Sequence, residues 1–378
     1  MPSSSASLSP ASRWPAVASW FSRTPAPLLG IDISASSVKL VELGLDRRGR
    51  RVLERCALEP LERGWVVDGS VERFDEVARA MARAVQASGS RTRQVAMALP
   101  ASAVITKTIL LPRGLSESEL ESQVQAEASQ YIPFSLDEVS LDFSVNPASA
   151  AGDASEVEVL IAASRRDRVQ DRQALAEAAG LRPRILDVET FASRLAASRL
   201  VGQADTAGGQ GAAGDEVLAL FDVGAASTKL QVLCGDEMLY DSEQTSGGLQ
   251  LTQQIARHFG LSFAEAEARK CSGNLPAAYE DALLKPFVET LAQDIVRSLQ
   301  FFFTSTAHAR VDRVLLAGGC AALPGLPEAV ALHAACPCSR LDPFQDMALA
   351  STAQALGTRA DVPAFLTACG LALRRFLP

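Results

Sequence analysis

The chain has 378 residues, of which 48% are hydrophobic and 21% are charged, and its formal net charge is −8. This composition predicts a globular protein that is long enough for two domains. The negative charge argues against a general nucleic-acid binder. The sequence contains no run of 18 apolar residues, so no membrane span is predicted. Seven scattered cysteines and three histidines give neither a disulfide framework nor zinc-ligand spacing, so reduced thiols are the simplest interpretation.

The first 27 residues are rich in Ser, Ala and Pro, which predicts a flexible N-terminal tail. They lack the basic start and apolar core of a signal peptide. An alternative is a short amphipathic turn that touches a membrane surface, formed by Arg13, Trp14, Val17, Trp20, Phe21 and Arg23.

A hairpin pattern occurs twice. Residues 28–43 read LLGIDISASSVKLVEL, and residues 217–233 read VLALFDVGAASTKLQVL. In each copy an aspartate (Asp32, Asp222) ends an apolar run, a turn of small residues follows, and a lysine (Lys39, Lys229) stands seven positions after the aspartate. We therefore predict one fold present twice, with the hairpins facing each other. Two unrelated hairpins are the alternative, since small residues and Asp are common in turns.

The first half alternates strand and helix patterns after its hairpin. Ser116 and Glu119 form a capping box that starts a helix, and Pro133 ends that helix. A helix over 165–179 is expected to close an inserted α+β unit. The expected strands are 50–61, 94–100, 103–112, 138–145, 157–164 and 182–190. Further helices are expected over 71–88 and between the last of these strands and the linker.

The second half follows a Gly-rich linker at 201–215 and begins with the repeated hairpin. Two short helices, a long helix from Pro286 and a strand that ends at Gly318 and Gly319 come next, and Val362 to Phe376 is expected to be the last helix of this domain. The predicted organisation is a tail (1–27), a first domain (28–200) with an insert at about 101–181, the linker, and a second domain (216–378).

Several familiar motifs are excluded by their context. A G-x-G-x-x-G at 209–214 lies in the linker and precedes a strand, whereas a dinucleotide fingerprint follows a strand and opens a helix. No lysine follows a glycine, which excludes a Walker A loop. The S-x-x-K from Ser36 to Lys39 spans a β-turn rather than a helix start, unlike that of β-lactamases.

The repeated hairpins have a physical interpretation as phosphate sites. Small residues in a tight turn allow backbone N–H groups to surround phosphate oxygens, and Lys39 and Lys229 add positive charge. Asp32 and Asp222 suit a hydrated Mg²⁺ ion between the domains, because Mg²⁺ keeps several waters and takes few carboxylates.

These features together resemble the actin-like ATPase superfamily: paired phosphate hairpins, the Gly318-Gly319 turn and a linker between halves. The position of the insert resembles the FtsA branch. Within that branch, LLGIDISASSVKLVEL, QYIPFSLDEVSLDFSV (130–145) and CGLALRRF (369–376) are similar to the PilM family of type IV pilus assembly proteins. The resemblance covers about 26–376 and implies a two-domain actin-like ATPase fold, FtsA-like, with a small α+β subdomain inserted in the first domain.

The resemblance also implies roles for individual residues. The first phosphate site would comprise Asp32, Ser34, Ser36, Ser37 and Lys39, and the second Asp222, Gly224, Ser227, Thr228 and Lys229. The sugar and adenine would be held by Gly247, Gly248, Glu267, Lys270, Gly318 and Gly319. Asp187 and Glu189 would lie near the γ-phosphate as catalytic candidates. A solvated helix face is the alternative for Glu267 and Lys270, and a strand-end ion pair is the alternative for Asp187 and Glu189.

The implied function is a cytoplasmic adaptor at the inner membrane that binds ATP with Mg²⁺ and the N-terminal peptide of PilN, with other pilus assembly proteins as further partners. Nucleotide would mainly fix the domain angle, with at most slow hydrolysis. The alternatives are an FtsA-like division filament and a small-molecule kinase. A type II secretion scaffold is a third rival, but that protein carries a transmembrane helix.

The peptide is expected in a groove between the first domain and its insert, where an extended segment can add to a sheet edge. Ile132 and Phe134 are the apolar residues of a short connection that normally holds polar ones. They either fill the core of the insert or face this groove.

Overall fold

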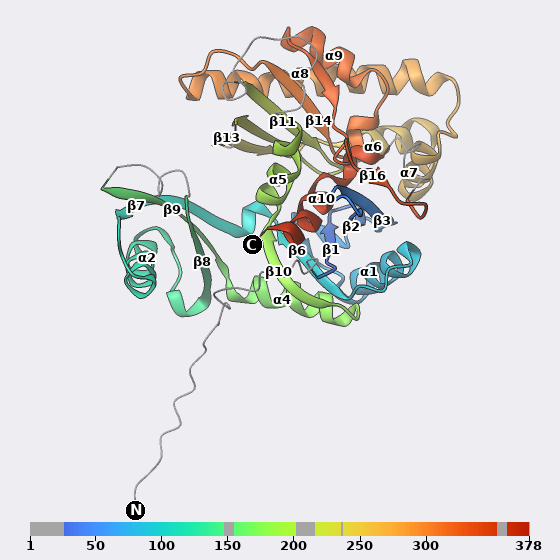
Figure 1. Cartoon of the computed structure of the whole chain (residues 1–378). Coiled ribbons are helices and arrows are strands. Elements are labelled where there is room, and N and C mark those ends of the chain that lie inside the picture. Colours follow the sequence, from blue (N-terminus) through green and yellow to red (C-terminus); the bar gives the residue numbers. More distant parts are fainter. Residues whose placement is uncertain (1–25, 147–154, 202–215, 236, 354–360, 378) are drawn as a thin grey trace, which may run out of the picture.

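The computed structural model describes residues 26–146, 155–201, 216–235, 237–353 and 361–377. Two large sheets with their helices lie one above the other, and a third, smaller sheet projects to one side (Figure 1). The expected linker, apart from its first residue, and nearly all of the expected tail lie outside the described residues. Among the described helices, none is long and apolar enough to cross a membrane.

The first sheet has six strands in the order β10-β6-β1-β2-β3-β16. The β1–β2 and β2–β3 pairs are antiparallel, whereas β6 runs parallel to both β1 and β10. Helices cover both faces, so a central strand such as β2 is buried along nearly its whole length and its sequence is a continuous apolar run. The strands are β1 (Leu29–Ile33), β2 (Ser37–Leu45), β3 (Arg51–Pro60), β6 (Gln94–Leu99), β10 (Arg182–Val188) and β16 (Ala348–Leu349).

Helices α1 (Phe74–Ser88) and α4 (Arg166–Ala178) pack on the outer face of this sheet. The expected helix from residue 71 begins three residues later, because Val71 belongs to a two-stranded hairpin of β4 (Val66–Val67) and β5 (Ser70–Val71). The sequence pattern predicts that α4 closes the insert. Its Leu175 and Ala176 instead belong to the core beneath the first sheet.

The second sheet has the order β13-β12-β11-β14-β15. Helix α8 carries a buried stripe that packs beneath the sheet, as its sequence pattern predicts. The strands are β11 (Val217–Val223), β12 (Thr228–Cys234), β13 (Glu237–Gln244), β14 (Arg313–Ala317) and β15 (Cys338–Arg340). The helices are α6 (Gly248–Phe259), α7 (Phe263–Ser272), α8 (Lys285–Ser305) and α9 (Leu326–Ala334).

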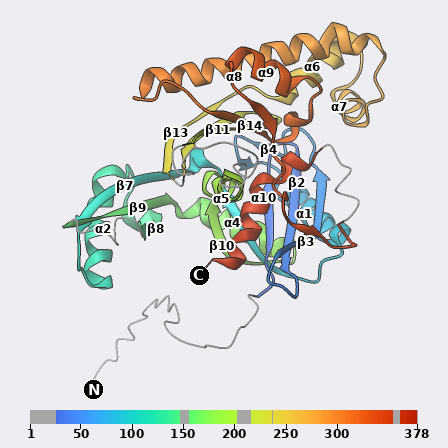
Figure 2. The ribbon, with the colours of Figure 1, turned by 45° about the horizontal axis from the view of Figure 1, so that its top comes forward.

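Helices α5 (Glu189–Val201) and α10 (Leu366–Leu373) fill the space between the two sheets, as both ribbon views show (Figures 1 and 2). One hydrophobic cluster includes Leu43 of the first sheet, Leu220 of the second sheet and Ala368 of α10. Residues 362–376 were expected to be the last helix of the second domain, but in the structure they pack between the two sheets. The chain returns at its end and packs α10 against β1, β2 and α5.

The insert has a three-stranded antiparallel sheet, β7-β9-β8, and one helix, α2 (Glu117–Tyr131). The predicted capping box is present, since Ser116 and Glu119 each bond the other's backbone N–H. The strands are β7 (Val104–Pro112), β8 (Val139–Val145) and β9 (Glu156–Arg165). This unit has its own small core, which includes Val124, Ala128 and Ile161.

Candidate functional site

The two repeated hairpins have the same register. Asp32 lies directly opposite Lys39 across β1 and β2, and Asp222 lies directly opposite Lys229 across β11 and β12. A spacing of seven residues around a tight turn therefore places each pair side by side on one face of its sheet. The duplication predicted from the sequence is present in the fold.

The turn of the first hairpin is held by a compact polar network. Lys39 Nζ lies 2.8 Å from Asp32 Oδ2 and 2.9 Å from Ser34 Oγ. The backbone N–H of Ser34 donates to the carbonyl of Ser37 over 3.0 Å, which closes the turn. Asp32 and Lys39 retain only 13% and 9% side-chain exposure, so this ion pair is shielded from water and held in place.

The second hairpin differs because its lysine turns away from the aspartate opposite it. Lys229 Nζ lies 2.5 Å from Glu189 Oε1 at the start of α5. Burial favours a lower pKa for Lys229, but the Glu189 and Asp222 carboxylates outweigh it and raise that pKa. Glu189 also accepts the backbone N–H of Ala101 at 3.1 Å. It thus joins the second hairpin to the first residues of the insert.

The side chain of Asp222 has no hydrogen bond or ion pair with any residue of the described chain. Burial raises its pKa, Lys229 and Lys39 act in the opposite direction, and Asp32 and Glu189 raise it further. Charged groups of both hairpins therefore act on this one carboxylate. A partly buried carboxylate without a partner is a suitable cation ligand.

Glycines allow the backbone to approach closely at the floor of the second turn. Gly318 has φ +83°, and a Cβ there would collide with Asp222 Oδ1 and the carbonyl of Val223. A Cβ on Gly247 would lie 2.6 Å from the carbonyl oxygens of Gly224 and Ala225. A Cβ added to Gly319, by contrast, would have no neighbouring atom within 4 Å. Two closely packed glycines beside an open one form a cradle suited to a ligand.

Glu267 and Lys270 lie at this cradle rather than on a solvated face. Their side chains pair at 2.7 Å, and Lys270 Nζ also donates to Thr252 Oγ1 at 2.7 Å and to the carbonyl of Gly248 at 3.3 Å. Thr252 in turn bonds Glu267. Cys320 Sγ also lies close to Gly248, and burial raises the pKa of its thiol to about 11, so the thiol stays protonated.

The two catalytic candidates, Asp187 and Glu189, have different contacts. Asp187 makes a bidentate ion pair with Arg374, at 2.6 and 3.0 Å, and also accepts the backbone N–H of Val188. Both its oxygens are occupied, as in the ion-pair alternative. Of the two candidates, only Glu189 contacts a hairpin lysine, Lys229.

The remaining turn residues have mostly structural contacts. Thr228 Oγ1 donates to the carbonyl of Ser246 at 2.7 Å, and Ser227 Oγ bonds Glu243 at 2.6 Å. The carbonyl of Ser36 accepts the backbone N–H of Leu61 at 2.8 Å. Sequence reasoning missed Thr252, Cys320 and Arg374. Cys320 directly follows the glycine pair and was detectable, but Arg374 is 187 residues from Asp187 and gave no local signal.

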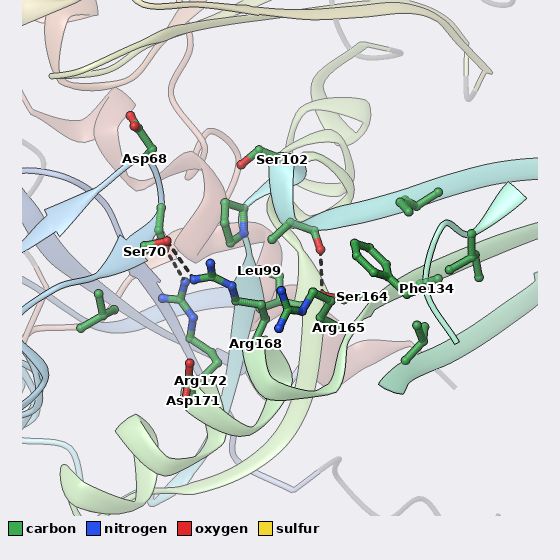
Figure 3. Close-up of a pocket in the computed structure, with 18 of the residues that line it drawn as sticks. Asp68, Ser70, Leu99, Ser102, Phe134, Ser164, Arg165, Arg168, Asp171 and Arg172 are labelled. Carbon is green, nitrogen blue, oxygen red and sulfur yellow. Dashed lines mark hydrogen bonds between the residues drawn. The ribbon is translucent and has the colours of Figure 1, made fainter. Parts of the chain in front are cut away.

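A hollow of about 620 Å³ lies between the first domain and the insert (Figure 3). Phe134 lies on the side of the insert, and Arg168 and Arg172 come from α4 on the other side. Phe134 is 42% exposed, whereas Ile132 is 7% exposed and belongs to the core of the insert. Of the two apolar residues of this connection, Ile132 therefore fills the core of the insert and also borders the hollow, and Phe134 faces the hollow.

Two of the arginines that line the hollow are held by the loop around β5. Arg168 donates to Ser70 Oγ at 2.9 Å, and the buried Arg172 donates to the carbonyl of Gly69 at 3.2 Å. Burial lowers the pKa of Arg172, while Asp32, Glu189 and Asp171 oppose this shift. This guanidinium lines the hollow and also feels the charge of Asp32 in the first hairpin.

Comparisons with known proteins agree with this architecture. A family model described as type IV pilus assembly protein PilM matches residues 30–376. A solved structure of a PilM-PilN type IV pilus biogenesis complex is 30% identical, with a TM-score of 0.75, and the match covers 94% of this chain and 100% of the other. The ethanolamine utilization protein EutJ from Carboxydothermus hydrogenoformans is 16% identical, with a TM-score of 0.53 and coverage of 92% and 90%. The fold is that of the actin-like ATPases.

Proposed function

The chain belongs to the family of the type IV pilus assembly protein PilM, and we propose that it is an adaptor at the cytoplasmic face of the inner membrane that binds the N-terminal peptide of a PilN-like membrane protein. The similar solved structure is a complex of PilM with PilN, which makes PilN the partner of that relative. Neither a division filament nor a small-molecule kinase is favoured by these similarities.

The peptide is proposed to lie in the hollow between the first domain and the insert. The observation that supports this is Phe134, a large aromatic side chain that lines the hollow and remains 42% exposed. Large aromatic residues in a binding groove often contribute much of the binding energy. Apolar residues of the peptide would contact Phe134, and its polar groups would meet Arg165 and Arg168.

We propose ATP with Mg²⁺ as the ligand of the cleft between the hairpins. Lys39 and Lys229 would bind phosphate oxygens, Asp32 and Asp222 would hold the hydrated metal ion, and Gly318 and Gly319 would leave room for the nucleoside. Magnesium would neutralise phosphate charge when it is bound. Since Lys229 is paired with Glu189, contact with phosphate would require this lysine to exchange one anion for another.

Hydrolysis is expected to be slow. Fast phosphoryl transfer needs a positioned water and often an arginine at the γ-phosphate. Glu189 is the candidate for orienting water, but its Oε1 accepts two hydrogen bonds, and Arg172 is buried against Gly69. A turnover near 10 per second, typical of an efficient enzyme, would contradict this proposal.

The adaptor proposal is tested by titrating a synthetic PilN N-terminal peptide against the full chain in a calorimeter. Phe134→Ala is expected to weaken binding by about 2 kcal/mol while the melting temperature changes little. Leu110→Ala is the matched control, because Leu110 is an exposed apolar residue of the insert (60% exposed) that does not line the hollow. Equal loss in both variants, or none in either, would reject the docking site.

A further inference from the structure

A basic patch lies at one edge of the molecule. It comprises Arg47, Arg48, Arg50 and Arg51, at the turn between β2 and β3, together with Phe376 and Leu377 near the C-terminus. All four arginines are exposed. Residues 46–51 carry four arginines and one aspartate, a net charge of +3, whereas the whole chain has −8. The patch therefore has the opposite sign to the protein that carries it.

The turn holds its arginines outward. Asp46 Oδ1 accepts the backbone N–H groups of Arg48 at 2.8 Å and Arg50 at 2.9 Å, and Gly49 closes the turn with φ +77°. Asp46 also pairs with the side chain of Arg50 at 2.8 Å. The single acid of the turn is thus used in its structure.

Apolar side chains lie among these charges. The ring of Phe376 is within 5.8 Å of the Arg51 guanidinium and 5.6 Å of that of Arg375. A shallow hollow separates the C-terminal turn from the β2–β3 turn and is lined by Leu45, Arg51 and Phe376. Leu45 is 37% exposed and Leu377 is 42% exposed. This surface therefore combines charged guanidinium groups with apolar side chains that are only partly exposed.

The patch is distinct from both sites described above. Leu29 pairs with Glu42, so the beginning of β1 and the end of β2 share one edge of the first sheet, whereas Asp32 lies at the opposite end. The described chain also begins at this edge, with β1.

We propose that the patch binds the surface of a membrane that contains anionic phospholipids, with the arginines on the phosphate groups and Leu377 and Phe376 at the boundary of the acyl chains. Clustered basic residues bind anionic bilayers, and neighbouring apolar side chains add affinity by entering the interface. A membrane is favoured over nucleic acid because apolar groups stand within the charged cluster and the rest of the chain is acidic.

The test is flotation of the full chain with vesicles of phosphatidylethanolamine and phosphatidylglycerol, compared with vesicles of phosphatidylcholine alone. Binding is expected only to the anionic vesicles and is expected to fall at 500 mM salt, where charges are screened. Arg47→Ser combined with Arg48→Ser should reduce partitioning about 25-fold, since each surface arginine contributes about fivefold. Leu377→Ser should reduce it further at every salt concentration.

The matched control is Arg257→Ser combined with Arg310→Ser, which removes the same charge from exposed positions of the second half and should leave binding unchanged. Equal losses in the two double variants would overturn the patch as the binding surface. So would binding that disappears with Trp14→Ser and Trp20→Ser but survives the Arg47 and Arg48 substitutions. Binding to duplex DNA without binding to anionic vesicles would also overturn the proposal.

Discussion

Asp32 and Asp222 occupy the same position in a repeated motif and have opposite environments. Asp32 is paired with Lys39, whereas Asp222 has no side-chain partner among the described residues and has lost its lysine to Glu189. A partly buried carboxylate without a partner lowers the stability of the folded state when it is ionised. The motif thus gives one hairpin a neutralised carboxylate and the other a carboxylate that is available to a ligand.

Without nucleotide, Asp222→Asn is expected to raise the melting temperature at neutral pH, since it removes a buried charge. Burial raises the pKa of Asp222, so the folded state binds this proton more tightly than the unfolded state does. The penalty is absent below the unfolded pKa of about 3.9 and grows as pH rises through the folded pKa. The gain from Asp222→Asn should therefore vanish near pH 4 and be largest near pH 7.

The control for this pH series is Asp32→Asn, which leaves Lys39 without its anion and should lower the melting temperature at pH 7. Scanning calorimetry of both variants between pH 4 and pH 8 measures the difference. If Asp222→Asn is as destabilising as Asp32→Asn, then the carboxylate of Asp222 has a stabilising partner and the assignment of an available ligand is wrong.

The same pair of residues predicts how metal and nucleotide act together. A ligand that binds only the folded state at a hundredfold excess over its Kd stabilises that state by about 2.7 kcal/mol. ATP with Mg²⁺ should raise the melting temperature of the wild type more than ATP with EDTA does. Asp32→Asn and Asp222→Asn should each reduce the difference between these two conditions. A full Mg²⁺-dependent shift in both variants would contradict the proposed site.

At the scale of elements, the hairpins were predictable because their signal is local. The seven-residue spacing of Asp and Lys, around a turn of small residues, directly specifies their cross-strand pairing. The glycine turn after β14 was equally visible as a pair of glycines ending an apolar run. The sequence could not distinguish the two glycines, because only the fold shows that Gly318 meets Asp222 while Gly319 faces open space.

This difference gives a prediction about the β14 turn. Gly318→Ala is expected to cost about 2 kcal/mol or more of stability, because φ is positive there and the added Cβ collides with the backbone of Val223. It should also abolish nucleotide binding. Gly319→Ala, with space around its Cβ, should leave the stability of the nucleotide-free protein nearly unchanged. Urea denaturation of both variants checks this, and similar midpoints would refute the close packing at Gly318.

At the scale of the whole molecule, the two halves share a core that was not predicted. Every residue of α10 is buried, so its sequence shows no polar face from which a packing direction could be inferred. Its partners, β1, β2 and α5, are distant in sequence. The Asp187–Arg374 pair connects β10 to the same C-terminal segment. Residues 362–376 follow the second domain in the sequence and were therefore expected to belong to it. In the structure they lie between the two sheets.

A shared core predicts that the halves unfold together. On one side of α10, a Cβ on Gly370 would collide with the carbonyl of Ala192 in α5; on the other, a Cβ on Gly30 would collide with Ala368. Gly370→Ala and Gly30→Ala should each cost about 1 to 3 kcal/mol or more, since overpacking forces the backbone apart. Each substitution should lower the temperature of a single calorimetric unfolding transition and should not split it into two. Hydrogen exchange should show β1 and β11 losing protection together, because β11 contributes Leu218 and Leu220 to the cluster that contains α5 and α10, and β1 packs against α10. If Gly30→Ala releases only the first sheet while β11 keeps its protection, the halves are independent, and α10 is not their common support.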